Sequence, residues 1–186
     1  MSDPFATQFG TWRGALRLAL AHAEVATGNA GIVPPDPASV RRLVFVCHGN
    51  ICRSAYAAGL ARRAGMSVAS FGLSTSSGTG AWPLVAERAL ARGLDLSSHR
   101  TTRVEDYVPL AGDYLLGMET RHLRKLAENP LTVAFPRGLL GSYAAPAVPH
   151  LHDPYQLDPA YMEVCLTRIE RAVAALVTRY PGAIAA

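Results

Sequence analysis

The sequence predicts an α/β protein with a three-layer α/β/α fold, in which helices cover both faces of a four-stranded parallel sheet, plus an N-terminal helical extension. Two observations lead to this prediction. From residue 43 onward, short apolar segments alternate with segments of helical periodicity, an order that favours parallel strands joined by right-handed crossovers. A proline-rich segment precedes them, so we divide the chain into an extension with its connector, residues 1–40, and one domain, residues 41–186.

The extension is predicted to contain one amphipathic helix, over residues 11–27. Trp12, Leu16 and Leu20 recur at helical spacing and form an apolar stripe, and Gly28 supplies a stop signal. The three prolines within residues 31–40 predict an extended connector after the helix. We expect the stripe to pack either against the domain or against a second copy of the chain, which would form a homodimer.

Within the domain, the predicted elements alternate in type. The segment LVFVC is rich in β-branched and aromatic residues, as expected of a strand buried on both faces. Pro83 and Gly93 mark the start and the end of a helix, and the last helix carries apolar residues along one side. In chain order we predict strands at residues 43–47, 66–71, 113–118 and 131–135, and helices at residues 54–64, 83–93, 119–127 and about 159–179.

Composition argues against several classes of function. The net charge of +4 comes from scattered Lys and Arg residues, so no nucleic-acid partner is expected. No uncharged run reaches the roughly 18 residues of a membrane helix, so we expect no membrane insertion. The cysteines number three, which is too few and an odd count for a disulfide scaffold. We therefore expect reduced thiols and a cytoplasmic location.

The segment LVFVCHGNICRS, residues 43–54, predicts an anion site with a thiolate at its floor. Cys47 ends the first strand, at the edge of a parallel sheet where ligands usually bind. Gly49 and Asn50 tolerate left-handed backbone angles, so the loop can turn its N–H groups inward. These donors and the N-terminus of the following helix favour an anion and the thiolate form of Cys47. Cys47 is therefore a candidate nucleophile.

Arg53 and Ser54 complete this loop. The planar guanidinium of Arg53 can bind two oxygens of a phosphoryl group, and Ser54 can donate a hydrogen bond to the leaving thiolate. This combination indicates phosphoryl transfer to sulfur, which requires no metal and no cofactor. The predicted phosphate-binding loop consists of His48, Gly49, Asn50, Ile51, Cys52 and Ser54, with Cys47 and Arg53 as catalytic residues.

The segment VFVCHGNICRS resembles the signature of the low-molecular-weight protein tyrosine phosphatases. The likeness extends from about residue 43 to residue 180 and includes HDPY at 152–155, SSHR at 97–100 and DYLLGM at 113–118. The resemblance implies a protein tyrosine phosphatase that hydrolyses phosphotyrosine through a cysteinyl-phosphate. In this scheme Asp153 is the general acid that protonates the leaving phenolate. The loop at 74–79 is closer to bacterial members, whose substrates include bacterial tyrosine kinases, so we expect a tyrosine-phosphorylated protein substrate.

The resemblance also implies supporting roles for residues outside the loop. Ser54, Ser70 and His99 are expected to hold Asn50, and the substrate pocket is expected to include Ile51, Ser76 and Tyr155. Cys52 stands where a second thiol traps an oxidised nucleophile as a disulfide in the family. A small buried residue beneath the loop is the alternative role for Cys52.

Three other functions remain open on the sequence. A protein arginine phosphatase has a similar loop with threonine in place of Ile51, whose apolar side chain favours an aromatic ester. A thioredoxin-coupled arsenate reductase shares the fold, but residues 70–110 lack the cysteines of its relay. A non-catalytic phosphotyrosine-binding module would not need to retain Cys47, Arg53 and Asp153 together. Glu119 departs from the family pattern, which has aspartate there.

Overall fold

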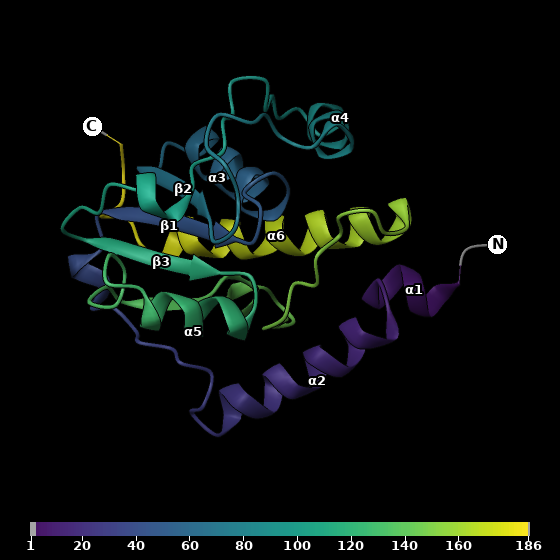
Figure 1. The fold of residues 1–186 in the computed structure, drawn as a ribbon, viewed down its shortest axis with the longest axis horizontal. Helices are drawn as coiled ribbons and strands as arrows, with labels where there is room; N and C mark the ends of the chain where they lie inside the picture. The colour runs from purple at the N-terminus through teal and green to yellow at the C-terminus, as the bar shows by residue number, and fades with distance from the viewer. Residues whose placement is uncertain (1–2, 186) are drawn as a thin grey trace.

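The computed structural model describes residues 3–185 and contains the predicted parallel sheet between two helical layers (Figure 1). The strand order is β2-β1-β3-β4, and all three pairings are parallel. The strands are β1 (Arg42–Cys47), β2 (Val68–Gly72), β3 (Asp113–Gly117) and β4 (Arg137–Leu139). The three-layer fold with its N-terminal helical extension is therefore confirmed.

The helices of the domain fall close to their predicted positions. They are α3 (Arg53–Arg63), α4 (Pro83–Ala91), α5 (Thr120–Glu128) and α6 (Pro159–Arg179). The extension folds into α1 (Pro4–Phe9), which the sequence did not predict, and α2 (Trp12–Ala26). Short 3-10 turns occur at η1 (Pro37–Ser39), η2 (Val104–Asp106) and η3 (Leu140–Tyr143). Among residues 3–185, no helix has both the length and the apolar character needed to cross a membrane.

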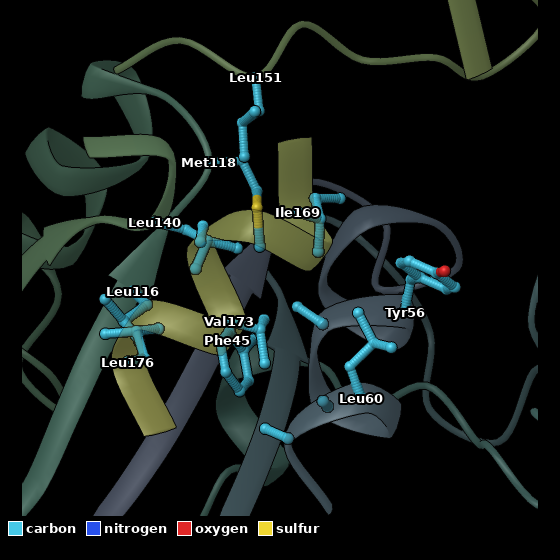
Figure 2. Packing of buried hydrophobic residues seen from close by; sticks show 14 of the residues in the cluster. Phe45, Tyr56, Leu60, Leu116, Met118, Leu140, Leu151, Ile169, Val173 and Leu176 are labelled. Atoms are coloured by element: carbon cyan, nitrogen blue, oxygen red, sulfur yellow. The ribbon is translucent and has the colours of Figure 1, made fainter. Parts of the chain in front are cut away.

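The alternation of side chains along β1 separates two hydrophobic cores. Leu43 and Phe45 point to the face covered by α3 and α6, whereas Val44 and Val46 point to the face covered by α5. Figure 2 shows the first core, where Phe45 lies beside Val173 of α6. Because β1 is central and buried on both faces, its carboxyl end and the loop after it have a rigid support.

The predicted strand at residues 131–135 is wrong, because this segment forms turns and β4 begins only at Arg137. The Asn129 carbonyl accepts hydrogen bonds from the backbone N–H groups of Thr132 and Val133. The Thr132 hydroxyl is buried and donates to the Leu126 carbonyl. In a strand packed on the core, Leu131 and Val133 would point inward and Thr132 outward. The structure shows the reverse, because Thr132 is buried and the two apolar residues are exposed.

The apolar stripe of α2 does not pack against the domain. Trp12, Leu16 and Leu20 are 64%, 51% and 54% exposed, so the expectation that this stripe docks on the domain is wrong. The buried residues of α2 are Gly14 and Ala21, whose small side chains allow a close approach. The alternative in which a second copy covers the stripe remains a prediction.

The connector also contacts the domain, at the edge of the sheet. Val33 and Arg137 exchange backbone hydrogen bonds of 2.9 and 2.8 Å and form an antiparallel bridge beside β4. The carboxylate of Glu24 at the end of α2 pairs with Arg124 of α5. The extension is thus attached at several points, and the bridge covers part of an otherwise open strand edge.

We expect the substitution Asp113→Ala to lower the free energy of unfolding by about 3 kcal/mol, because it removes one partner of a buried ion pair. The buried Asp113 carboxylate accepts two hydrogen bonds of 2.6 Å from Arg42, one of 2.8 Å from the Leu110 N–H and one from the Tyr107 hydroxyl. Urea unfolding measures the change. The exposed control Glu87→Ala should change it by less than about 0.5 kcal/mol. An equal effect of both substitutions would contradict this account.

Candidate active site

The candidate site lies in the loop between the carboxyl end of β1 and the N-terminus of α3. Cys47 is the last residue of β1, and Arg53 is the first residue of α3. Asn50 adopts a left-handed backbone angle, with φ of 54°, and its N–H donates to Cys47 Sγ at 3.2 Å. The Ser54 hydroxyl lies 2.9 Å from the same sulfur. Donors therefore converge on Cys47 Sγ, an arrangement that favours negative charge there.

Asn50 is the fixed centre of the loop. Its side-chain amide donates to Ser54 Oγ at 2.9 Å and to Ser70 Oγ at 3.0 Å. Its amide oxygen accepts from the Thr102 N–H at 2.9 Å, and its backbone carbonyl accepts from His99 Nε2 at 2.7 Å. The side chain is completely buried. The structure thus gathers Ser54, Ser70 and His99 around Asn50, and burial lowers the pKa of His99.

The Arg53 guanidinium is hydrogen-bonded at Nη1 and contacts Asp153 along its other edge. Its Nη1 donates to Glu119 Oε1 at 2.7 Å and to the Leu151 carbonyl at 2.8 Å. Among the described residues, its Nε and Nη2 have no hydrogen-bond partner, although Nη2 makes an ion-pair contact of 2.7 Å with Asp153. Nε and Nη2 form the fork with which arginine binds two oxygens of an anion. Burial opposes the charge of Arg53, but Asp153 and Glu119 outweigh it and raise its pKa.

Leu151 anchors the segment that carries Asp153. Its N–H donates to the Met118 carbonyl at 2.9 Å, directly after β3. Figure 2 shows its side chain beside Met118 in the first hydrophobic core. Since its carbonyl also binds Arg53, Leu151 places Asp153 at a defined distance from the guanidinium.

Glu119 is a site residue to which sequence reasoning assigned no role. It is buried, and its two oxygens pair with Nη2 and Nε of Arg121 at 2.8 Å, in addition to the Arg53 contact. Two histidine nitrogens, His122 Nε2 and His150 Nδ1, lie 3.8 Å from the carboxylate. Burial raises the pKa of Glu119, but these neighbours, led by Arg53, lower it well below its usual range. Its place directly after a central strand was the available signal.

A pocket of about 330 Å³ opens above Cys47. Ile51 and Tyr155 form part of its wall, Arg53 and Asp153 line it, and small polar residues close one side. These polar residues are Ser74, Thr75 and Thr79 rather than the predicted Ser76. The Trp82 ring lies 4.9 Å from the Tyr155 ring, and the Trp82 N–H donates to the Ile51 carbonyl at 2.9 Å. Sequence reasoning missed Trp82.

The other residues of the loop after β1 also lie at the pocket. His48, Gly49 and Cys52 line the pocket with Cys47. Cys52 is a free thiol, and burial raises its pKa well above the ordinary value. Its disulfide with Cys47 remains a prediction. Within residues 3–185, no cluster of His, Cys, Asp and Glu side chains has an arrangement that could hold a metal ion.

Replacing Asn50 by alanine should weaken the binding of inorganic phosphate by about tenfold, which corresponds to roughly 1.4 kcal/mol. The variant loses the side-chain hydrogen bonds that hold the loop and places alanine, which adopts left-handed angles less readily than asparagine, at this position. Isothermal titration calorimetry measures the affinity. The matched control Asn129→Ala, in the turn after α5, should bind phosphate as the wild type does. Unchanged affinity of Asn50→Ala would refute a role for this network.

The free energy of unfolding should decrease as the pH falls from about 6.5 to about 4. Burial lowers the pKa of His150 to about 4, whereas the unfolded chain takes up this proton near 6.5. The unfolded state therefore binds more protons in this window. Urea unfolding at several pH values should show a smaller slope for His150→Gln, and an unchanged slope for the exposed control His22→Gln. Equal slopes for wild type and His150→Gln would contradict the assignment.

Comparisons with known proteins place this site in a family. The sequence model of the family described as low molecular weight phosphotyrosine protein phosphatase matches residues 42–182. The probable low molecular weight protein-tyrosine-phosphatase EpsP of Ralstonia solanacearum is 30% identical over 145 residues, which cover 75% of this chain and 96% of that protein. The low molecular weight protein-tyrosine-phosphatase Wzb of Salmonella typhi is 31% identical over 133 residues, which cover 70% and 88%.

Solved structures agree with this assignment. The tyrosine phosphatase amsI of Erwinia amylovora is 26% identical with a TM-score of 0.65, over 75% of this chain and 92% of that one. The YwlE arginine phosphatase of Geobacillus stearothermophilus is 20% identical with a TM-score of 0.63, over 74% and 91%, a likeness of fold alone. The family model and the relatives together show that the chain is a hydrolase that belongs to the low molecular weight phosphotyrosine protein phosphatase family.

Proposed function

We propose that this enzyme hydrolyses phosphotyrosine in proteins through a cysteinyl-phosphate on Cys47, with Asp153 as the general acid. The observation that carries the proposal is the Nε and Nη2 edge of Arg53, which contacts Asp153 through Nη2, in the pocket that Arg53 lines together with Cys47. A phosphoryl group bound to this fork and to the loop N–H groups would have its phosphorus next to the sulfur. Proximity and charge stabilisation then act on the same group.

In the first step, the Cys47 thiolate attacks phosphorus and the bond from phosphorus to the phenolic oxygen breaks. The Asp153 carboxyl donates its proton to the departing oxygen, whose conjugate acid has a pKa of about 10. In the structure, Asp153 contacts Arg53 Nη2 at 2.7 Å. The incoming phosphoryl group displaces it from the guanidinium and leaves it at the pocket mouth, beside the leaving group.

In the second step, water attacks the phosphorus of the cysteinyl-phosphate and the sulfur–phosphorus bond breaks. The Asp153 carboxylate accepts the proton from this water, which restores its acid form. The Ser54 hydroxyl, 2.9 Å from the sulfur, donates to the thiolate as it leaves. Inorganic phosphate then departs, and the chain returns to its starting state without a metal or another cofactor.

The pocket walls favour an aromatic ester over a guanidinium phosphate. Ile51 contributes an apolar surface, and Tyr155, whose ring lies against Trp82, contributes an aromatic one. A phenyl ring can stack between such surfaces, whereas a cationic guanidinium would gain less from the apolar wall. The substrate we infer is a tyrosine-phosphorylated protein, such as a bacterial tyrosine kinase. The three unpaired, buried cysteines support a location in the reducing cytoplasm.

The mechanism is tested with p-nitrophenyl phosphate and a phosphotyrosine peptide in the presence of a metal chelator. Wild type should turn over both substrates, and Cys47→Ser should turn over neither. Asp153→Ala should hydrolyse the phosphotyrosine peptide at least about 100-fold more slowly, because it lacks the acid. The matched control Cys165→Ser, a cysteine of α6 outside the pocket, should remain active. Rapid quench and mass spectrometry should detect one phosphate on wild-type Cys47.

Other outcomes distinguish the alternatives. Faster hydrolysis of a phosphoarginine peptide than of the phosphotyrosine peptide would identify an arginine phosphatase. Tight phosphotyrosine binding without turnover would identify a binding module. Turnover retained by Cys47→Ser would overturn the cysteinyl-phosphate mechanism.

A further inference from the structure

The segment that carries Asp153 has no regular secondary structure of its own. Residues 144–158 lie between η3 and α6, and all of them are described. Anchors in the domain include the backbone contacts of Leu151, the ion-pair contact of Asp153 with Arg53 Nη2 at 2.7 Å, and the Tyr161 hydroxyl, which donates to the His152 carbonyl at 3.1 Å. The His152 side chain, directly before Asp153, contacts both the domain and the extension.

The extension contacts the His152 ring, alongside His150 and Tyr161 of the domain. The Thr11 hydroxyl, at the start of α2, lies 3.2 Å from His152 Nε2. Gly14, in the first turn of α2, lies against the same ring, and a Cβ at this position would be 3.0 Å from two ring carbons. It would also lie 2.1 Å from the Phe9 carbonyl oxygen, so only glycine permits this approach.

A second glycine brings the extension to the same segment. Gly10, between α1 and α2, has a φ of 74°, and a Cβ there would lie 2.9 Å from Leu157 and from Tyr161. Figure 1 shows α1 beneath the N-terminal end of α6, with the chain before α6 passing between the extension and the sheet. Residues 10–14 therefore contact both ends of the stretch from His152 to Tyr161.

The His152 ring is also connected to the anion-binding guanidinium. Thr11 Oγ1 accepts from the Gly14 N–H at 3.1 Å and lies 3.2 Å from His152 Nε2, to which the hydroxyl donates when the ring is protonated on Nδ1. His152 then carries its proton on Nδ1, which lies 3.4 Å from His150 Nε2. The Nδ1 of His150 faces Glu119, which binds Arg53. These tautomers are assigned from the contacts, and the 3.8 Å between His150 Nδ1 and the Glu119 carboxylate is longer than a hydrogen bond.

We propose that the N-terminal extension positions the general acid: Thr11 and Gly14 hold the His152 ring and thereby fix the Asp153 carboxyl at the pocket mouth. The proposal rests on the proposed function. Thr11, Gly14 and His152 are positioning residues, because none of them lines the pocket above Cys47. The family match covers residues 42–182, so Thr11 and Gly14 lie outside it, whereas His152 and Asp153 lie within it.

A displaced general acid has a recognisable kinetic signature. Protonation matters most when the leaving phenolate is basic, and it matters little for p-nitrophenolate, whose negative charge is already stabilised. The loss of positioning should therefore lower kcat/KM for phenyl phosphate much more than for p-nitrophenyl phosphate. A general loss of folding would lower both values equally, because it removes active enzyme.

The experiment compares kcat/KM for these two substrates in the full chain. Thr11→Ala and Gly14→Ala should each lose about tenfold on phenyl phosphate, a part of the typical 10²- to 10⁴-fold contribution of an acid, and less than about twofold on p-nitrophenyl phosphate. Thr11→Ser keeps the hydroxyl and should restore both values. Thr27→Ala is the matched control, because Thr27 is exposed at the other end of α2, where its hydroxyl donates to α2 carbonyls and accepts from the Asn29 side-chain amide.

Asp153→Asn separates this inference from the proposed function. If Asp153→Asn shows the selective loss on phenyl phosphate but Thr11→Ala and Gly14→Ala do not, the positioning role is wrong and the function stands. Equal losses on both substrates in these two variants would also overturn the role. If Asp153→Asn shows no selective loss, or the wild type has no turnover, the proposed function fails and this inference fails with it.

Discussion

The buried charge of Arg53 is the constraint on which the rest of the site depends. A guanidinium that is 1% exposed must find anionic or carbonyl partners inside the protein. Glu119 and the Leu151 carbonyl satisfy it along one edge, and both follow from the sheet, because β3 pairs with β1 and Leu151 binds to the end of β3. Since both partners bind Nη1, the fork on the other edge has the Asp153 carboxylate as an ion-pair contact at Nη2.

The left-handed backbone angle and the buried amide of Asn50 have an energetic cost, which hydrogen bonds within the site offset. Asn50 adopts a left-handed angle that few residues tolerate, and its amide would be costly to bury without partners. The hydrogen bonds from Thr102 and to Ser54 and Ser70 satisfy the amide and fix the angle together. The same geometry directs the Asn50 N–H at Cys47 Sγ. Strain and function therefore share one network, as expected of a preorganised anion site.

The part of the site that could be predicted from the sequence is the part formed by consecutive residues. The loop from Cys47 to Ser54 is continuous, so the order of residue types sufficed to identify it. Glu119 and the Leu151 carbonyl join the site only through the β1–β3 pairing and the path of the chain after β3, which no local pattern reports. The apolar character of residues 131–135 led to a wrong strand prediction. This pattern does not distinguish a strand from a turn in which the one buried residue is Thr132.

The sequence analysis expected the face of α2 with the large apolar residues to pack on the domain, but the opposite face does so. Burial of Trp12 would have contributed more hydrophobic stabilisation than burial of Gly14, yet Gly14 is the residue turned inward. A contact made through glycine, a hydroxyl and one ion pair contributes little apolar area, but it fixes distances closely. Such a contact suits the placement of a neighbouring segment better than the general stabilisation of the fold. On this argument, the extension acts on the geometry of the segment that carries Asp153.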